Sequence, residues 1–500
     1  MRLKEVISGL GCEVIGKDDV EITGISCDSR KVERGAEGGV IFAAIPGEHT
    51  DGHAYLKSAV ENGAAAVLAE RTTDGITVPQ VIVKEIRAAL SKISDTFWAR
   101  PSGMLRVVGV TGTNGKTTIT YLLEAVLKEA GFLPGVIGTV NYRYGGGVFP
   151  APHTTPQSPE LHRILREMAD KGVTHCVMEV SSHSLEQKRV EDCRFVCGIF
   201  SNLTHDHLDY HRTMEEYFRC KTLLFRHVED NKGVAVINRD DPWGAKLKKD
   251  FPAAITYGLK AGDFHPESYE LKDGGIEALV ETPKGEIKVS SNLVGEYNLY
   301  NILAAVAASS SLGVKAEAIA RGIAALKRVP GRLEKIEAKG ARSFRAYVDY
   351  AHTGDALERA LFALKAVAAG RVITVFGCGG NRDRLKRPAM GEISARLSDI
   401  TIVTSDNPRD EDPLEIIKEV EAGIKGVKKL DPEGPFNGKG YAVIPDRAEA
   451  IRKAVKIARD GDTILVAGKG HEDYQIVKGR KSHFDDFEVV NSAIKETANS

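Results

Sequence analysis

The sequence has almost no net charge and no long apolar run. Its 500 residues contain 68 Lys and Arg against 69 Asp and Glu, a formal net charge of −1. A protein without a large positive field has no general attraction for nucleic acid or for an anionic membrane, so it must bind anionic ligands through individual loops and side chains. No apolar run approaches the ~20 residues of a membrane-spanning helix. We therefore expect no nucleic-acid partner and no membrane partner.

The cysteines do not have the spacing of a disulfide framework. They are seven, an odd number, and include no Cys-x-x-Cys pair. Several, such as Cys176, lie in apolar runs, which is typical of reduced, buried thiols in a cytosolic protein. The first residues, Met-Arg-Leu-Lys-Glu-Val-Ile-Ser, carry charges where a signal peptide needs an apolar stretch. We expect a cytoplasmic protein and favour a monomer, although the sequence leaves the oligomeric state open.

Length and local composition indicate several domains. A hydrophobic content of 42% and a charged content of 27% are ordinary for a globular protein. A chain of this length is long enough for about three domains. Changes in composition near residue 103 and near Val329-Pro-Gly331 divide it into segments 1–103, 104–331 and 332–500.

The order of apolar runs predicts an α/β fold. The second segment opens with an apolar strand, Leu105–Val110, followed by a Gly-Thr loop and a helix to Ala130. In the third segment strands such as Val372–Phe376 and Ile464–Ala467 alternate with helices. Such alternation is typical of a parallel sheet covered by helices, with ligands bound at the carboxyl ends of the strands.

The most specific local signal is a glycine-rich loop between strand and helix, Gly109-Val-Thr-Gly-Thr-Asn-Gly-Lys-Thr-Thr118. Consecutive backbone N–H groups in such a loop can surround a triphosphate, and the helix N-terminus adds a favourable dipole. Lys116 would neutralise the β- and γ-phosphates, and Thr117 would bind Mg²⁺. The strict phosphate-loop pattern has Gly where this chain has Val110, so an ordinary glycine turn is the alternative.

A histidine-rich segment follows. His205-x-His207-x-Asp209 begins like a zinc-hydrolase motif, but residue 210 is Tyr and the third histidine comes one place late. With a nucleotide loop upstream, we favour a role in Mg²⁺ binding for one of these histidines. Taken alone, the segment would be interpreted as solvated loop histidines.

Two further residues have a functional and an ordinary interpretation. Glu179 ends an apolar strand, where a carboxylate can reach a metal beside the phosphates; a capping or salt-bridging acid is equally compatible with its local sequence. Lys221 lies in a helix that begins at the capping box Thr213-Met-Glu-Glu. By itself it would be interpreted as a solvated helix lysine.

Polar loops follow four strands of the last segment: 349–352, 377–382, 405–409 and 468–472. The second of them fails the GxGxxG dinucleotide pattern because residue 382 is Arg, which is better suited to a carboxylate or phosphate. Acids and arginines at one sheet edge suit a zwitterionic ligand. Solvated loop charges are the alternative for any one of these loops.

Together these motifs resemble the Mur ligases, from about residue 22 to about residue 486. The resemblance rests on Asp28-Ser-Arg30, Thr111-Gly-Thr-Asn-Gly-Lys-Thr-Thr118, Met178-Glu-Val-Ser-Ser-His183, Asn202-Leu-Thr-His-Asp-His-Leu-Asp-Tyr-His211, Asp349-Tyr-Ala-His-Thr353, Asp406-Asn-Pro-Arg409 and Gly468-Lys-Gly-His-Glu-Asp-Tyr-Gln475. It implies a small N-terminal α/β UDP-binding domain, a central phosphate-loop ATPase-like domain with a parallel sheet, and a C-terminal Rossmann-like domain that binds an amino acid. Residues 262–290 match poorly.

The resemblance also implies roles for individual residues. The ATP site would contain Gly112, Thr113, Asn114, Gly115, Lys116, Thr117, Thr118, Asn298, Asn301, Arg332 and Asp349. The UDP-sugar-peptide site would contain Ser29, Thr154, Thr155, Ser181, Gln187 and Arg189. The amino-acid pocket would contain Arg382, Asp406, Asn407, Pro408, Arg409, Gly468 and Glu472. Thr117, Glu179, His207 and Lys221 would serve Mg²⁺, with Lys221 carbamylated to N6-carboxylysine; Lys116, Lys221, His207 and Glu179 would be catalytic.

The form Asp-Asn-Pro-Arg resembles the family members that add meso-diaminopimelate rather than L-lysine. Diaminopimelate has a second amino-carboxylate end that Arg409 and Glu472 could pair, and lysine has no such carboxylate. The resemblance thus implies ATP-dependent, Mg²⁺-assisted addition of meso-diaminopimelate to UDP-N-acetylmuramoyl-L-alanyl-D-glutamate through an acyl phosphate, in peptidoglycan synthesis. Gly354 departs from the proline usual in the family, which affects loop stiffness.

Three other functions were considered: a sister ligase for lysine or another residue, a folate-type polyglutamate ligase, and a phosphate-loop NTPase switch or motor. Thr154-Thr155 together with Asp406–Arg409 argue against the first two. Phosphate release that requires both the UDP-peptide and diaminopimelate would exclude the third.

Overall fold

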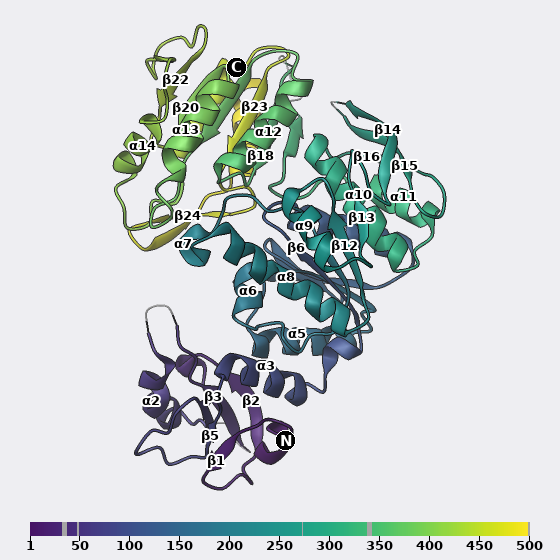
Figure 1. The fold of residues 1–500 in the computed structure, drawn as a ribbon. Coiled ribbons are helices and arrows are strands. Elements are labelled where there is room, and N and C mark those ends of the chain that lie inside the picture. Colours follow the sequence, from purple (N-terminus) through teal and green to yellow (C-terminus); the bar gives the residue numbers. More distant parts are fainter. Residues whose placement is uncertain (33–37, 48–49, 273, 338–342, 499–500) are drawn as a thin grey trace.

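The computed structural model describes residues 1–32, 38–47, 50–272, 274–337 and 343–498. Three sheet-containing parts follow one another along the chain, with the N-terminal and C-terminal parts on opposite sides of the central part (Figure 1). The predicted α/β class is confirmed. Within the described residues, no helix combines the length and the apolar character needed to cross a membrane.

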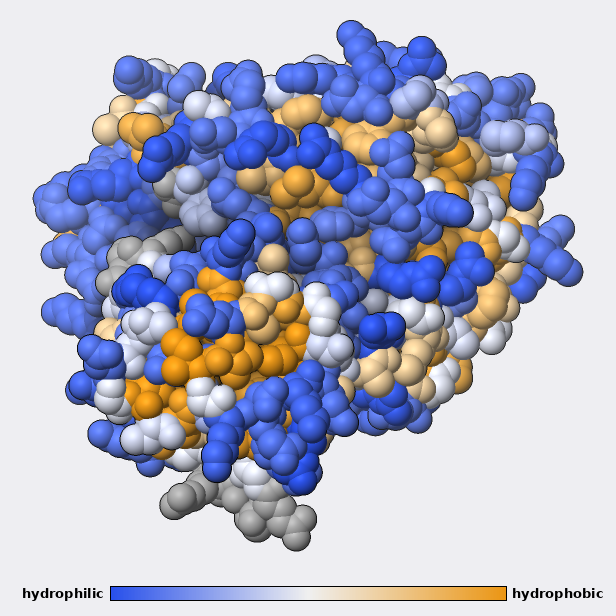
Figure 2. All heavy atoms as spheres, turned by 60° about the horizontal axis from the view of Figure 1, so that its bottom comes forward, coloured by the Kyte–Doolittle hydropathy of each residue, from blue (hydrophilic) through white to orange (hydrophobic). Residues whose placement is uncertain are grey.

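The N-terminal part is a five-stranded sheet in the order β1-β5-β4-β3-β2, in which only β1 is antiparallel to its neighbour. Its strands are β1 Glu13–Ile15, β2 Ile22–Ser26, β3 Gly39–Ala43, β4 Ala66–Ala69 and β5 Gln80–Ile82, and its helices are α1 Leu3–Val6, α2 Leu56–Glu61 and α3 Ile86–Phe97. In the view of Figure 2 this part comes forward, and apolar residues gather in one area of it.

The central part is an eight-stranded sheet in the order β13-β12-β11-β6-β10-β7-β8-β9, parallel from β13 to β7. Its strands are β6 Arg106–Thr111, β7 Pro134–Ile137, β8 Asn141–Tyr144, β9 Gly147–Pro150, β10 His175–Glu179, β11 Phe195–Phe200, β12 Val234–Asn238 and β13 Ile255–Tyr257. Its helices are α4 Lys116–Glu129, α5 Ser158–Asp170, α6 Ser182–Glu186, α7 Leu208–His211, α8 Met214–Asp230, α9 Pro242–Asp250, α10 Glu296–Ser311 and α11 Ala316–Ala325. The poorly matching stretch forms a separate antiparallel sheet, β14 His265–Lys272, β15 Gly275–Glu281 and β16 Ile287–Ser291.

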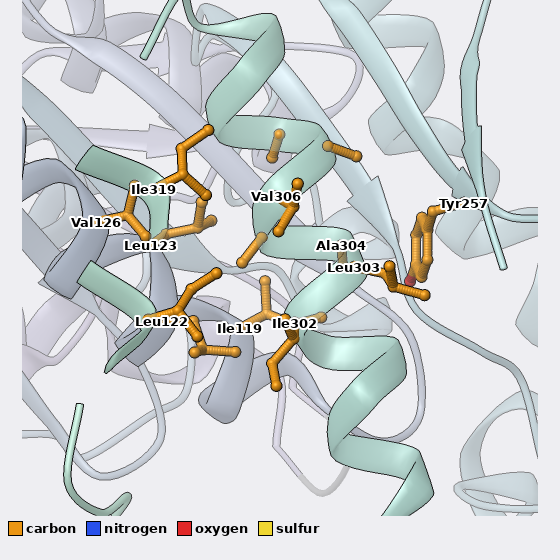
Figure 3. Close-up of a cluster of buried hydrophobic side chains, with 14 of the residues drawn as sticks. Ile119, Leu122, Leu123, Val126, Tyr257, Ile302, Leu303, Ala304, Val306 and Ile319 are labelled. Carbon is orange, nitrogen blue, oxygen red and sulfur yellow. The ribbon is translucent and has the colours of Figure 1, made fainter. Parts of the chain in front are cut away.

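Helix α4, which follows the glycine-rich loop, is fixed by apolar packing. Its Ile119, Leu122, Leu123 and Val126 pack in one buried cluster with side chains of α10 and α11 (Figure 3). Gly322 of α11 lets the backbones approach, because a Cβ there would lie 2.4 Å from the Cα of Val126. The predicted strand and helix around the loop are β6 and α4.

The C-terminal part is a seven-stranded sheet in the order β17-β18-β23-β19-β20-β22-β21, with only β17 antiparallel. Its strands are β17 Glu334–Glu337, β18 Arg345–Asp349, β19 Val372–Phe376, β20 Ile400–Val403, β21 Lys428–Lys429, β22 Gly440–Val443 and β23 Thr463–Ala467, followed by a hairpin of β24 Tyr474–Val477 and β25 Arg480–His483. Its helices are α12 Gly354–Val367, α13 Lys386–Leu397, α14 Pro413–Glu421, α15 Arg447–Ile457 and α16 Asp486–Ala498.

The strand register of this sheet aligns its polar loops. Ala467 at the end of β23 pairs with Asp349 on one side and Phe376 on the other, and Phe376 pairs with Val403. The four loops that follow these strands therefore leave one edge of the sheet together, as the sequence pattern predicted.

A buried ion pair holds the strand that carries one of these loops. Arg447 and Asp486 are fully buried and joined by two hydrogen bonds of 2.7 Å, and Arg447 Nη2 also donates to the carbonyl of Ala467 at 2.9 Å. We expect Asp486→Ala to lower the free energy of unfolding by about 3–5 kcal/mol, because it leaves a buried guanidinium without its counter-ion. Thermal or urea unfolding measures this loss.

The matched control is Glu415→Ala, which removes an ion pair with Lys418 in which both side chains are more than 60% exposed. That variant should unfold as the unmodified protein does. Equal unfolding midpoints for the two variants would contradict a structural role for the buried pair.

Candidate active site

A cavity of about 460 Å³ lies where the central and C-terminal parts meet. Its lining joins three groups of residues that are far apart in the sequence: the glycine-rich loop, the carboxyl ends of the central strands, and the end of β18 with the start of α12. Of the residues predicted from the sequence, it brings together Thr113, Asn114, Gly115, Lys116, Thr117, Thr118, Thr154, Glu179, Ser181, His207, Asn301, Arg332 and Asp349.

The glycine-rich loop has the close packing that its glycines predict. Gly112 has φ +141°, and a Cβ there would lie 1.9 Å from Ser201 Oγ. Lys116 closes over the loop, with Nζ donating to the carbonyls of Gly112 at 2.9 Å and Thr113 at 2.8 Å. Burial lowers the pKa of the Lys116 ammonium, and the charges of Glu179 and Asp206 oppose that effect.

Lys221 is buried at the same carbonyl. Only 2% of it is exposed, its Nζ donates to Gly112 O at 2.9 Å, and the ammonium lies 4.5 Å from the centre of the Tyr217 ring. Burial, with a further contribution from the charge of Lys116, lowers the pKa of Lys221 well below its usual value. The interpretation of Lys221 as a solvated helix lysine is therefore wrong.

Glu179 is 1% exposed and is held by hydroxyl and amide donors rather than by a cation. Its Oε1 accepts from Thr117 Oγ1 at 3.0 Å and from the Thr139 N–H at 2.9 Å, and its Oε2 accepts from Thr139 Oγ1 at 3.0 Å. Thr139 could not be predicted, because an isolated threonine in the turn after β7 has no recognisable sequence pattern.

The oxygens of Thr117 and Glu179 suit a magnesium ion. Adjacent oxygen ligands of an octahedral Mg²⁺ at ~2.1 Å lie ~3 Å apart, and the two oxygens are separated by 3.0 Å. His207 lines the same cavity, and its Nε2 lies 3.4 Å from Asp206 Oδ2. The oxygens of Thr117 and Glu179 would fit a hard divalent cation, and His207 would add a nitrogen donor in the same cavity lining.

The residues predicted for the adenosine side of ATP form two groups, those that line the cavity and those that hold the lining residues in place. Asn301 lines the cavity, whereas Asn298 is buried behind it and accepts from Asn301 Nδ2 at 2.9 Å. Arg332 reaches the phosphate loop, with Nη2 donating to Thr117 Oγ1 at 3.2 Å. Burial raises the pKa of the Asp349 carboxyl, although Arg332 and two backbone N–H groups stabilise its charged form.

Five of the six residues predicted for the UDP-sugar-peptide are linked by hydrogen bonds to one network behind Glu179. They are Thr154, Thr155, Ser181, Gln187 and Arg189. Within it Thr155 Oγ1 donates to the Glu179 carbonyl at 2.8 Å, and Arg189 Nη1 donates to the Thr155 carbonyl at 2.9 Å.

The sixth residue, Ser29, lies in a short 3₁₀ turn of the N-terminal part. Close to it, burial raises the pKa of the Cys27 thiol to about 12, against the charges of Arg87 and Arg189. The two guanidinium groups thus lie near the same end of β2, between the N-terminal and central parts. Arg87 was not predicted, since within α3 it has the pattern of a solvated helix arginine.

The predicted amino-acid residues form a second polar site at the edge of the C-terminal sheet. Asn407 is its centre: its Nδ2 donates to Glu472 Oε2 at 2.8 Å, and its Oδ1 accepts from Lys469 Nζ at 3.0 Å. Lys469 is fully buried and also lies 3.4 Å from Asp406 Oδ1. Burial and the charge of Asp406 raise the pKa of Glu472. These groups are therefore not solvated loop charges.

Two arginines border this site. Arg409 has φ +53° and donates from Nη1 to the Gly380 carbonyl at 2.7 Å. Arg382 is exposed and lies near the same Gly379, where a Cβ would lie 3.0 Å from Arg409 Nη1 and 3.9 Å from Arg382 Cγ. Pro408 and Gly468 complete the set: the Pro408 carbonyl packs against Gly380, and Gly468 packs against Asp406 Oδ2.

Comparison with known proteins identifies the class. Residues 21–98 match the description "Mur ligase family, catalytic domain", residues 110–309 "Mur ligase middle domain", and residues 331–470 "Mur ligase, glutamate ligase domain". The chain belongs to the Mur ligase family, whose members are ATP-dependent, as the motifs predicted.

The names of the similar proteins are more specific than the family descriptions. A protein of Geobacter metallireducens named UDP-N-acetylmuramoyl-L-alanyl-D-glutamate--2,6-diaminopimelate ligase is 48% identical and covers 99% of each chain. A solved structure with the same name is 33% identical, with a TM-score of 0.68 and 99% of each chain covered. MurF ligase from Thermotoga maritima in complex with ADP shares the fold, with a TM-score of 0.64 at 21% identity over 95% of this chain and 98% of that one.

The phosphate-loop assignment has a direct test. We expect Lys116→Ala to lower ATP-dependent turnover by about 10²–10³-fold or more, because it removes a preorganised cation from the transferring phosphoryl group. Circular dichroism should be unchanged. Lys128→Ala is the control, since Lys128 is an exposed lysine of the same helix that pairs only with Glu124 among its described contacts. Near-normal turnover of Lys116→Ala would remove the assignment.

Proposed function

We propose that the protein is an ATP-dependent ligase that joins meso-diaminopimelate to UDP-N-acetylmuramoyl-L-alanyl-D-glutamate in peptidoglycan synthesis. The observation that carries the proposal is the pairing of a phosphate-loop cavity with a cluster of side chains of both charge signs at the edge of the C-terminal sheet. We further propose a cytoplasmic location, which the seven free cysteines favour, with small molecules as the partners.

Forming an amide bond from a carboxylate and an amine requires activation of the carboxylate. A carboxylate does not react with an amine at neutral pH, because its charge repels the nucleophile and oxide is a poor leaving group. ATP removes the difficulty: a D-glutamate carboxylate oxygen bonds to the γ-phosphorus while the bond from that phosphorus to the bridging oxygen breaks, which gives an acyl phosphate and ADP. The amine of diaminopimelate then displaces phosphate from the acyl carbon and loses a proton.

The protein's own groups would act by charge and position. Lys116 and the loop N–H groups would stabilise the transferring phosphoryl group, and Arg332 would approach from the C-terminal side. Thr117, Glu179 and His207 would hold Mg²⁺, which supplies positive charge to the phosphate oxygens. Closure of the parts around the cavity would exclude water, which would otherwise hydrolyse the acyl phosphate.

One assay tests the function as a whole. Purified protein is incubated with ATP and UDP-N-acetylmuramoyl-L-alanyl-D-glutamate, with meso-diaminopimelate, L-lysine or other amino acids offered in turn, and the products are weighed by mass spectrometry. We expect a tripeptide product with diaminopimelate and phosphate release that requires all three substrates. Equal product with lysine would overturn the proposed specificity, and phosphate release without the UDP-peptide would favour an NTPase.

Specificity should depend on the second site. We expect Arg409→Ala to weaken the use of diaminopimelate by roughly 2–5 kcal/mol, the cost of truncating one partner of a buried charge pair, while the KM for ATP changes little. The control is Arg396→Ala, which removes a half-exposed arginine paired with Glu358 on the same domain. Steady-state kinetics with each substrate varied in turn provide the measurement. A larger effect on ATP than on diaminopimelate would contradict the assignment.

We propose that Lys221 is carbamylated by CO₂. The reaction needs an unprotonated amine, and the burial of Lys221 beside Lys116 favours that form. Carbamylation would convert the positive Lys221 side chain into a negative one. The repulsion between the two lysines would then become an attraction, and Mg²⁺ would gain a further anionic ligand.

Lys221→Ala should therefore be nearly inactive, and short carboxylic acids should restore part of its turnover by supplying the missing anion. Wild-type protein depleted of CO₂ should lose activity and regain it on addition of bicarbonate. Full activity of Lys221→Ala, or unchanged turnover after CO₂ depletion, would show that the modification has no role.

A further inference from the structure

A carboxylate of the C-terminal part binds the phosphate loop directly. Asp355, the second residue of α12, accepts at Oδ2 from Asn114 Nδ2 at 2.9 Å and from Thr204 Oγ1 at 3.1 Å. Asn114 lies in the loop before α4, and Thr204 lies in the segment that follows β11. The contact joins positions 241 residues apart in the sequence.

Asn114 is otherwise tied to the central part alone. Its backbone N–H donates to Asn202 Oδ1 at 3.0 Å, and its carbonyl accepts from Ser201 Oγ at 2.6 Å. The side-chain amide is the group of Asn114 that reaches the other domain. The same amide also lies 3.4 Å from Thr204 Oγ1 of the central part, so the C-terminal part adds a second acceptor that orients the side chain of the loop residue before Gly115.

Contacts within α12 orient the Asp355 carboxylate. Arg359, one helical turn further along α12, donates from Nε to both oxygens of Asp355 at 3.0 Å. Thr353 caps the same helix by accepting from the Ala356 N–H at 3.3 Å. Acids in the first turn of a helix and oppositely charged pairs four residues apart are both favourable. Arg359 also lines the cavity and reduces the repulsion between Asp355 and a bound phosphate.

We propose that Asp355 is a positioning residue that couples docking of the C-terminal part to the ATP-binding shape of the phosphate loop. This inference rests on the proposed ATP-dependent ligation. Hydrogen bonds to a carboxylate are about twice as strong as neutral ones, so the contact favours one arrangement of Asn114. A site that binds ATP better when the amino-acid-binding domain is docked must, by linkage, dock that domain better when ATP is bound.

Removing the carboxylate should therefore weaken nucleotide binding more than it slows the chemical step. We expect Asp355→Ala to raise the KM for ATP and the Kd of a non-hydrolysable ATP analogue with Mg²⁺ by ~10-fold, within the usual range for coupled sites. The kcat at saturating ATP should fall by no more than ~3-fold, because Lys116 and the loop N–H groups remain.

A double-mutant cycle isolates the contact. Calorimetry with the ATP analogue is carried out on the full-length protein, Asp355→Ala, Asn114→Ala and the double variant. In the Asn114→Ala background, Asp355→Ala should change the Kd much less than ~10-fold, because the Asn114 contact is already absent and only the contact with Thr204 Oγ1 remains to be lost. The same ~10-fold effect in both backgrounds would overturn the proposal, and so would an unchanged Kd in Asp355→Ala.

Two further variants separate coupling from folding. Glu358→Ala, on the same helix but paired outward with Arg396, should leave the Kd unchanged. Asp355→Asn keeps the size of the side chain and serves if the alanine variant does not fold. It should give an intermediate rise in Kd, and a wild-type Kd would overturn the proposal.

Nucleotide binding does not depend on which amino acid is ligated. A failed ligation assay with an intact cycle therefore overturns the proposed function alone, and normal ligation without coupling overturns the inference alone.

Discussion

The half-buried Lys116 and the buried Lys221 donate to one carbonyl oxygen, that of Gly112, and the rest of the site follows from this closeness. Lys116 and Lys221 each place Nζ 2.9 Å from that oxygen. Two ammonium groups in a water-poor position repel each other strongly unless anions are near. The carboxylates of Glu179 and Asp206 supply part of the compensation. A triphosphate would supply more negative charge, and the proposed carbamylation of Lys221 would replace one of the two positive charges by a negative one.

The same topological rule builds both polar sites. In the central sheet the loop after β6 and the end of β10 meet because adjacent parallel strands finish at one edge, and Glu179 pairs in register with Val110. In the C-terminal sheet the ends of β18, β23, β19 and β20 meet in the same way. Ligands of open α/β sheets bind at this edge. Each site is therefore built at the edge of one sheet, and Arg332, Asp349 and Asp355 of the C-terminal part add to the site of the central sheet.

The site could be predicted best from the sequence where a functional residue directly follows a strand. The loop 109–118 lies between β6 and α4 as expected, and Asp406 and Glu472 come from loops whose strands were recognised. The sequence also contains a pattern that indicates burial of Lys221. Its helical face is shared by Tyr217, Leu224, Phe225 and Val228, which are buried. No such signal exists for the contacts of Thr139 with Glu179 or of Asn114 with Asp355, because they depend on how distant segments dock. The sheet β14–β16 was missed because no motif marks its strands.

The two outer parts reach the central part by different contacts, and this difference bears on the order of events. The C-terminal part contacts the phosphate loop itself, through Arg332 at Thr117 and Asp355 at Asn114. The N-terminal part instead meets the central part through α3, where Lys92 pairs with Asp192 and Ser91 Oγ accepts from the Asp192 N–H. Movement of the C-terminal part would thus change the phosphate loop and the proposed ATP site, whereas movement of the N-terminal part would act on the segment around Asp192, close in sequence to the proposed UDP-peptide residues Gln187 and Arg189. A ligase that must not hydrolyse its acyl phosphate would gain from the first dependence, because the phosphate loop would be completed by the same domain that is proposed to hold the amine.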